Sequence, residues 1–397
     1  MKTKLTFFIY FFALHVSFSQ TFFNKGYQFG IPPVYLKTIQ LPDKGYFLYG
    51  GSDYPAAGFI GKIDTSGTML WGNRYEYSNS MIPPVFWSAV LDHNQHVVIA
   101  TQGDYPDIGS LLKADTSGNI IWDIQFNFPI TNVLLTSDSN YAVLGCQSGA
   151  AGSNPEVQFY KISPAGSVIF GHEYFNTTSP TAYNIQSKYT SGLIEYPDGN
   201  YYLLTCVQPG SIFVMKIDPN GQLIWNKKYI QLSVNNWTDS PSDGTWKMIL
   251  MPDTTLFICG SSYHITTTEI ICFKINLNGN VLWSQSYSSG TVKNGVINAF
   301  LDVDSTVVLF TALIDSGNYI NDHAVLKIDQ NGVLLNNFSF RNSNDPVYPM
   351  WFAKDNYSHY NFIQYAGFDP INNYDTIQIT RIDSLFQSPC VSDTTGP

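Results

Sequence analysis

Two short stretches of the sequence carry side chains whose chemistry suits ligand binding. Residues 231–245 include Asn236, Trp237, Asp239 and Asp243, and residues 104–107 read Asp104, Tyr105, Pro106 and Asp107. An aromatic ring beside paired carboxylates can stack on a sugar or hold a hard cation through oxygen ligands. The same residue types are ordinary turn formers, and they lack the spacing of a calcium loop. An alternative therefore stays open, in which the ring packs inside its own loop and the carboxylates form turns. We expect no metal or cofactor.

Other residues with catalytic potential form no recognised pattern. Six histidines show no metal-ligand spacing: His93, His96, His172, His264, His323 and His359. The sequence has no G-x-S-x-G elbow, phosphate-binding loop, zinc motif or nucleotide fingerprint. A formal net charge of −10 without basic clusters argues against nucleic acid or anionic lipid as a partner. We therefore assign no catalytic residue, and we expect His93 and His96, which flank a turn, to face solvent.

A repeated motif must position these stretches. It begins with Lys216-Ile217-Asp218 and ends at Trp225, and further copies begin at Lys62, Lys113, Lys161, Lys274, Lys327 and Arg381. Successive copies start 48 to 58 residues apart, which is the period range of β-propeller blades.

Each copy predicts a β-hairpin followed by an aromatic residue. Its polar turn ends in a glycine that can supply the positive φ of a tight reversal. The glycines are Gly67, Gly118, Gly166, Gly221, Gly279 and Gly332, and the aromatic position holds Trp71, Trp122, Phe170, Trp225 and Trp283, with Asn336 as an exception. A large ring at a fixed offset from a turn is expected to pack between neighbouring units.

A second hairpin lies upstream of each copy, with an aspartate in its turn. The aspartates are Asp43, Asp92, Asp138, Asp198, Asp253, Asp304 and Asp355. Because they recur in every unit, where a catalytic pair would not, we interpret them as structural. One unit then has four strands, a to d, with short turns between a and b and between c and d.

The ends of the chain predict how the units close into a ring. The seventh copy stops near Phe386 and lacks its last strand, whereas Phe23 to Tyr27 resembles the segment Trp71 to Tyr75. We expect this N-terminal segment to pair with the strand around 377–382 and to complete the last blade. Closure leaves no long edge strand free. The predicted fold class is all-β, a seven-bladed β-propeller with four-stranded antiparallel blades.

The pattern K-I-D-x-x-G-x-x-x-W, preceded by the Asp-containing hairpin, resembles the repeat of secreted bacterial β-propellers of the SBBP type. It is more distantly similar to the tryptophan-docking repeat of quinoprotein propellers. The resemblance covers about residues 21 to 386. It implies a fold rather than an activity, since such propellers serve many roles.

Residues 1–19 have the features of a secretory signal peptide: Lys2 and Lys4, an apolar run, and Ser17-Phe18-Ser19 as the cleavage site. We expect a propeller over 20–387, a linker or tail over 388–397, and a secreted or surface-attached monomeric ring without membrane insertion.

Of the five cysteines, Cys259 and Cys272 lie on strands of one unit that can face each other, so a disulfide and two buried thiols remain open alternatives.

Loop lengths predict the binding face. The b–c and d–a connections leave the same end of the ring and differ in every unit, which is typical of a binding face on a rigid scaffold. We therefore favour a non-enzymatic interaction or adhesion module that binds a partner protein or glycan there. The alternatives are a polysaccharide-acting or quinone-dependent enzyme, which needs carboxylates or a cationic cofactor pocket at the channel mouth, and a structural component of a surface or secretion assembly, which needs a broad apolar patch.

Overall fold

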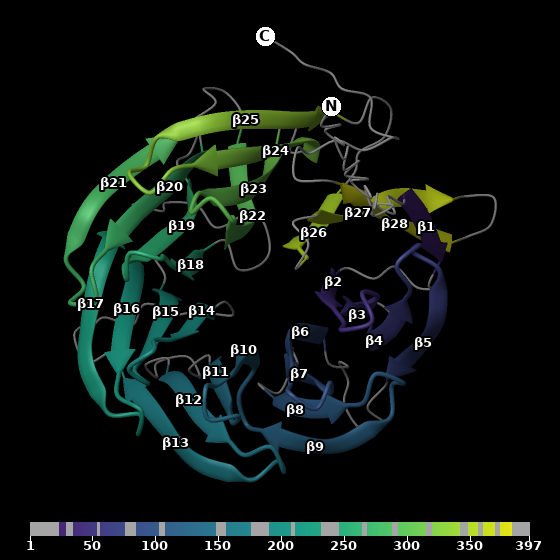
Figure 1. Cartoon of the computed structure of the whole chain (residues 1–397), viewed down its shortest axis with the longest axis horizontal. Helices are drawn as coiled ribbons and strands as arrows, with labels where there is room; N and C mark the ends of the chain where they lie inside the picture. Colours follow the sequence, from purple (N-terminus) through teal and green to yellow (C-terminus); the bar gives the residue numbers. More distant parts are fainter. Residues whose placement is uncertain are drawn as a thin grey trace, which may run out of the picture.

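The computed structural model describes seven four-stranded antiparallel sheets arranged as blades around a central axis (Figure 1). The described residues are 24–28, 35–53, 56–75, 85–102, 108–147, 156–175, 190–207, 211–231, 246–263, 268–287, 293–314, 320–341, 348–355, 360–369 and 374–382, and they contain no helix. The chain is thus a seven-bladed β-propeller, and the predicted fold class is confirmed.

The blades follow one another in chain order. Blades 1 to 3 comprise β2 (Tyr35–Gln40), β3 (Tyr46–Asp53), β4 (Ala56–Ile63), β5 (Met69–Tyr75), β6 (Val85–Leu91), β7 (Val97–Gln102), β8 (Gly109–Ala114), β9 (Ile120–Phe126), β10 (Ile130–Leu135), β11 (Tyr141–Gln147), β12 (Glu156–Ile162) and β13 (Val168–Phe175). Blades 4 to 6 comprise β14 (Thr190–Glu195), β15 (Tyr201–Val207), β16 (Ser211–Ile217), β17 (Leu223–Gln231), β18 (Lys247–Leu250), β19 (Leu256–Tyr263), β20 (Thr268–Ile275), β21 (Val281–Tyr287), β22 (Lys293–Leu301), β23 (Val307–Ile314), β24 (Ile320–Ile328) and β25 (Leu334–Arg341). Blade 7 comprises β26 (Tyr348–Lys354), β27 (Tyr360–Asp369), β28 (Tyr374–Ile382) and β1 (Asn24–Gln28).

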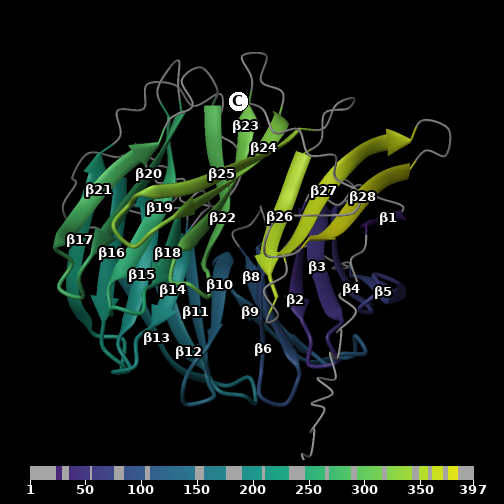
Figure 2. The same ribbon diagram turned by 45° about the horizontal axis from the view of Figure 1, so that its top comes forward.

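The N-terminal strand closes the ring. β1 pairs antiparallel with β28, placing Asn24 opposite Thr380 and Tyr27 opposite Ile377. In Figure 1 the dark purple β1 lies beside the yellow β28, and in the tilted view of Figure 2 blade 7 stands next to blade 1. The predicted closure is confirmed, although Phe23 lies outside the described residues. Because residues as far apart in the chain as Tyr27 and Ile377 complete one sheet, opening the ring must break this pairing.

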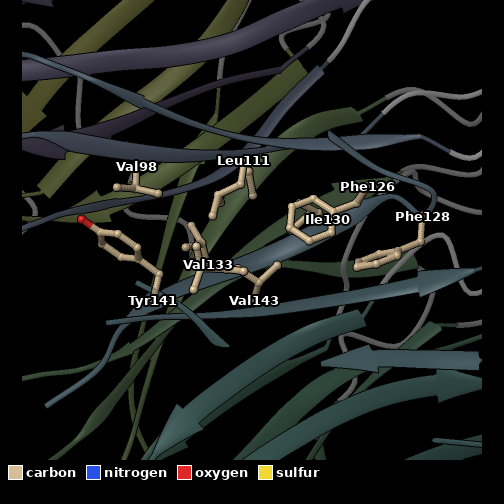
Figure 3. Packing of buried hydrophobic residues seen from close by; sticks show 10 residues of the cluster. Val98, Leu111, Phe126, Phe128, Ile130, Val133, Tyr141 and Val143 are labelled. Atoms are coloured by element: carbon tan, nitrogen blue, oxygen red, sulfur yellow. The ribbon is translucent and has the colours of Figure 1, made fainter. Parts of the chain in front are cut away.

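The core lies between blades. Each of seven buried apolar clusters combines residues of two neighbouring blades, including one between blade 7 and blade 1. Figure 3 shows the cluster of blades 2 and 3, where Val98 and Leu111 face Val133 and Tyr141. A single small sheet cannot bury such side chains alone, so every blade depends on both neighbours.

The repeated aromatic residues fasten the outer strands, as predicted. A methyl group added to Gly118 in blade 2 would lie 2.9 Å from the ring of Trp71 in blade 1. The rings of Trp122, Phe170, Trp225 and Trp283 meet Gly166, Gly221, Gly279 and Gly332 in the same way. Gly118 has φ +88°, a conformation that also favours glycine, so the turn and the docking surface need the same residue.

A tyrosine four residues later adds a hydrogen bond between blades. The hydroxyl groups of Tyr27, Tyr75, Tyr174, Tyr229 and Tyr287 donate to the carbonyl oxygens of Gly67, Gly118, Gly221, Gly279 and Gly332 in the next blade. Tyr27 makes this bond from the closing strand β1 to blade 1. The repeated spacing of the two aromatic residues is therefore explained by two contacts with one turn.

The a–b turns differ from this pattern. Their left-handed position holds Gly199 in blade 4, but Lys44, Gln95, Ser139, Thr254 and Ser305 in other blades, each with φ between 63° and 68°. Backbone bonds across the turn support it, such as Asp92 N–H to His96 O at 2.8 Å. The side chain of Asp92 also accepts hydrogen bonds from the N–H groups of Asn94 and His96, each at 2.8 Å.

Candidate functional site

The loop residues singled out in the sequence, namely Asn236, Trp237, Asp239, Asp243, Asp104, Tyr105 and Asp107, lie outside the described residues and stay predictions. The first described residue after the longer loop is Trp246. Its side chain is buried and packs against Phe273, with ring centroids 6.4 Å apart. Trp246 is therefore a core residue at the start of blade 5.

In six blades the repeated basic residue and the repeated aspartate form an ion pair within the blade. The Nζ to Oδ2 distances are 2.5 Å for Lys62 and Asp43, 2.8 Å for Lys113 and Asp92, 2.7 Å for Lys161 and Asp138, 2.5 Å for Lys274 and Asp253, and 2.7 Å for Lys327 and Asp304. In blade 7 the Nη2 atom of Arg381 lies 2.8 Å from Asp355. These contacts tie strand c to the a–b turn, which gives the aspartates a structural role.

The aspartates occupy two different turn positions, which the sequence pattern does not distinguish. Asp92 and Asp355 are buried at the first residue of the turn, whereas Asp43 lies two residues later and its side chain is 54 % exposed. Blade 6 uses both positions, because Lys327 lies 3.2 Å from buried Asp302 and 2.7 Å from Asp304.

The buried aspartates also link neighbouring blades. The hydroxyl of Tyr141 in blade 3 donates to Asp92 in blade 2 at 3.0 Å, and Tyr46 in blade 1 donates to Asp355 in blade 7 at 3.0 Å. Burial acts to raise the pKa of Asp92, but the hydrogen bonds from Lys113, His96 N–H and Tyr141 outweigh it and hold the pKa below its usual value. The charged form is thus bound into the framework, and it is not poised to exchange a proton near neutral pH.

The histidines do not assemble a site among the described residues. His93 is exposed on its turn, as predicted, but the prediction is wrong for His96, which is half-buried beside Asp92. The Nε2 atom of His172 lies 3.0 Å from the carbonyl oxygen of Asn220 in the next blade. His323 is buried against Phe310 and Phe362, and burial lowers its pKa to about 3. His264 and His359 lie outside the described residues.

The described residues contain no group of three or more histidine, cysteine, aspartate or glutamate side chains able to hold a metal ion. They also include no helix long and apolar enough to cross a membrane.

One position of the innermost strands varies from blade to blade. In each blade this residue pairs with the fourth residue of the second strand. In blades 1 to 7 it is Lys37, Ser88, Asn132, Gly192, Lys247, Asn298 and Trp351. Three of them reach the next blade, as in the bond from Lys37 Nζ to Trp87 O at 2.6 Å. In three blades this position therefore joins neighbouring blades, through a lysine, a serine and an asparagine.

Two lysines and two tryptophans form a cluster at this level, which we call the axial cluster: Lys37, Trp87, Lys247 and Trp351. Lys37 Nζ lies 4.6 Å from the ring centroid of Trp87 and 4.7 Å from that of Trp351, and Lys247 Nζ lies 5.9 Å from Trp351. Blade 6 stands between blades 5 and 7, so the contact of Lys247 with Trp351 crosses the inner side of the ring (Figure 1). All four side chains are half-buried.

The axial cluster lies about midway along the inner strands, with Trp351 as the fourth of the seven residues of β26. Lys247 is the first residue of β18 and directly follows the 231–245 insertion and Trp246, while Lys37 is the third residue of β2. A β-bulge at Trp87 adds one residue to β6 at this level, and the inner strands of blades 3, 4, 6 and 7 shift register at the equivalent place. Bulges re-aim side chains and are common beside functional sites.

Sequence reasoning missed the axial cluster. The inner strands carry no motif of their own, and the four residues are far apart in the chain. The signal that could have found three of them is an alignment of the blades on their a–b turns, because the residue four places before the turn is Lys, Ser, Asn, Gly, Lys, Asn or Trp; Trp87 is the bulge residue just before this position.

Apolar side chains also gather on the outer strands. Directly after the c–d turns, six blades expose aliphatic residues, each 42–55 % accessible: Leu70, Ile120, Ile121, Val168, Ile169, Leu223, Ile224, Val281, Leu282, Val333, Leu334 and Leu335. They repeat around the rim of the ring, and we call them the rim belt. Contiguous exposed apolar surface marks interaction sites more often than isolated residues do.

Comparison with models of protein families gave no match, and no curated protein matches the chain. The SBBP-type resemblance therefore stays a prediction. Among solved structures, the periplasmic gluconolactonase PpgL of Pseudomonas aeruginosa is similar, with 14 % identity, a TM-score of 0.54, and coverage of 86 % of this chain and 97 % of that one.

Two further solved structures are similar at lower TM-scores. A protein of unknown function from Bacteroides caccae has 13 % identity and a TM-score of 0.46, covering 74 % of this chain and 93 % of that one. Virginiamycin B lyase from Staphylococcus aureus has 12 % identity and a TM-score of 0.39, covering 77 % and 97 %. At these identities, likeness to solved structures concerns the fold alone.

Proposed function

We propose that the protein is an exported, non-enzymatic interaction module that binds a partner protein or glycan at the end of the ring carrying the b–c and d–a connections. The observation that carries this proposal is the axial cluster, because it is contributed by four blades, breaks the repeat on the inner side of the ring, and includes Lys247, which closely follows the 231–245 insertion. Half-buried indole and ammonium groups suit a ligand that presents an apolar face together with a polar or acidic group.

The repeated residues stabilise the framework, whereas the residues that are not repeated are free to serve a ligand. The Lys–Asp pairs and the docking aromatic residues make contacts within and between blades, so their chemistry is used by the framework. The axial cluster is not repeated around the ring, because the inner-strand position that holds Lys37, Lys247 and Trp351 holds serine, asparagine or glycine in the other blades, as expected for residues selected for one ligand. Candidate loop residues such as Trp237 and Asp239 would extend the same surface.

Binding assays with position-matched variants test the proposal. A glycan array identifies the ligand, and a blank array directs the search to surface proteins. We expect Lys37→Met and Lys247→Met each to weaken binding roughly 10- to 100-fold, the usual effect of losing a charged hydrogen bond. Lys227→Met is the matched control, because Lys227 also lies over a tryptophan, 5.7 Å from the Trp225 ring, but on an outer strand. Equal weakening by all three variants would contradict the proposal.

An enzyme remains the second candidate, and the axial ammonium groups favour its quinone-dependent form, since an anionic quinone needs a cationic pocket. The gluconolactonase shares the fold at 14 % identity, which does not transfer its activity. Titration with an anionic quinone, followed by its absorbance and by reduction of a dye, separates the two candidates. Quinone binding that is lost in Lys37→Met and Lys247→Met would favour the enzyme.

The rim belt favours a third candidate, a component of a surface or secretion assembly. Its aliphatic side chains could be covered by other subunits. Light scattering of the wild type and of a variant with Ile121→Ser and Ile224→Ser tests this. A wild-type assembly that dissociates in the variant supports the third candidate, whereas a monomeric ring in both supports the interaction module.

A further inference from the structure

We propose that Cys259 and Cys272 are an oxidation site, at which a cross-strand disulfide closes blade 5. The two residues lie directly opposite each other on the neighbouring strands β19 and β20. Both are fully buried free thiols, and both belong to the same apolar cluster between blades 5 and 6. Their side chains therefore point to the same face of the sheet.

The strand geometry allows the bond. Directly opposite residues of an antiparallel pair have Cα atoms about 4.5 or 5.5 Å apart, depending on the hydrogen-bonding pattern. Disulfides span Cα separations of about 4.4–6.8 Å, so either pattern is compatible. Opposite Cβ atoms at about 4.5–5.5 Å need to approach by no more than about 1–2 Å to reach disulfide geometry. Cys146 is a contrast within the same protein, since it lies opposite Val157.

The surroundings determine when the bond can form. Burial, and then the neighbouring Cys259, raise the pKa of the Cys272 thiol well above its usual value. Exchange requires a thiolate and access to the sulfur, so the folded dithiol reacts slowly. The bond therefore forms while blade 5 is still open during folding, and the folded blade then shields it from reductants.

The reaction needs a disulfide-bearing oxidant, such as oxidised glutathione. The thiolate of one cysteine attacks it, which forms a mixed disulfide and releases one glutathione thiolate. The second cysteine thiolate then attacks the mixed disulfide, which forms the S–S bond and releases the second glutathione thiolate. The two cysteine protons end on the two glutathione molecules, so two thiols are oxidised and one disulfide is reduced.

Peptide mapping of the full chain tests the site. The protein is refolded with oxidised and reduced glutathione and digested without reduction. Trypsin leaves both cysteines in residues 248–274, and a second cut after Glu269 separates them unless the disulfide joins the two pieces. We expect the joined peptide, with the peptide that holds Cys146 separate from it. Two free thiols at Cys259 and Cys272, or either one bonded to another cysteine, would overturn the proposal.

Thermal unfolding gives a second readout. Closing a loop of this length is expected to raise Tm by roughly 3–5 °C relative to the reduced protein, because a chain of this size has a large unfolding entropy. The difference between oxidised and reduced samples should vanish in the double variant Cys259→Ala with Cys272→Ala, and persist in Cys146→Ala. A difference of the same size in the double variant would assign it to other cysteines and contradict the proposal.

Discussion

The Lys–Asp pairs allow a comparison of burial, because the equivalent lysine is paired at two depths, with an aspartate at either of two turn positions. In blade 2 the side chains of Lys113 and Asp92 are 5 % and 4 % exposed, with Nζ and Oδ2 2.8 Å apart. In blade 1 those of Lys62 and Asp43 are 15 % and 54 % exposed, at 2.5 Å. Replacing each aspartate by asparagine removes the charge and keeps an acceptor for the turn.

The expected losses differ by severalfold. Asp92→Asn leaves the buried ammonium of Lys113 without its counter-charge, and breaking a buried pair costs about 3–5 kcal/mol. Asp43→Asn removes a pair with one solvated partner, which costs about 0–1 kcal/mol. Adding Lys113→Met to Asp92→Asn should restore part of the stability, since no uncompensated charge then remains.

Chemical denaturation followed by tryptophan fluorescence measures these losses. The sign of the pH dependence supplies an internal check. The pKa of Asp92 is lower in the folded protein than its ordinary value, so its contribution is present above about pH 4 and declines as the pH falls toward the folded pKa. Asp92→Asn should flatten this decline. Equal losses for Asp92→Asn and Asp43→Asn would refute the reasoning from burial.

Three further outcomes follow from the contacts between blades and from the buried histidine. The pKa of His323 is about 3 in the folded protein and near 6.5 in the unfolded chain. Between these values the unfolded chain binds more protons, so the free energy of unfolding falls as the pH drops. His323→Phe should reduce this loss in acid denaturation curves. Gly118→Ala should destabilise the ring in thermal melts by at least about 1 kcal/mol, because φ is +88° and the new methyl group would meet Trp71, whereas Gly295→Ala, which is not in a positive-φ turn, should cost less. Tyr229→Phe should cost about 1 kcal/mol by urea titration, since the Gly279 carbonyl loses its 2.9 Å bond, and an unchanged midpoint would contradict the assigned role of the repeated tyrosine.

Much of the fold could be predicted because its signals are local and repeated. A glycine at the end of each c–d turn, an aromatic residue at a fixed offset and the unmatched N-terminal segment together specify hairpins, blade contacts and closure. Tyr27 shows this well, since its spacing from Phe23 copies that of Tyr75 from Trp71 and it makes the corresponding bond to Gly67.

The candidate site could not be predicted in the same way. The contact between Lys247 and Trp351 depends on the width of the ring at the bulge level, which no local pattern encodes. The two turn positions of the aspartates were also missed, because Asp92 and Asp43 look alike until the strand register is known. The exposure of Leu70 and its counterparts could not be predicted either. Their apolar pattern alone suggests burial, but they lie on the outer strand, which is an edge of its sheet.

The most direct test of the division between framework and site is thermal unfolding with and without the bound glycan or protein partner. The midpoint without ligand reports stability, and the ligand-dependent rise reports affinity. We expect Asp92→Asn to lower the first and leave the second unchanged. Lys37→Met combined with Lys247→Met should abolish most of the ligand-dependent rise, with Lys227→Met behaving as wild type. A full rise in the axial variant, or its loss in Asp92→Asn, would contradict the account.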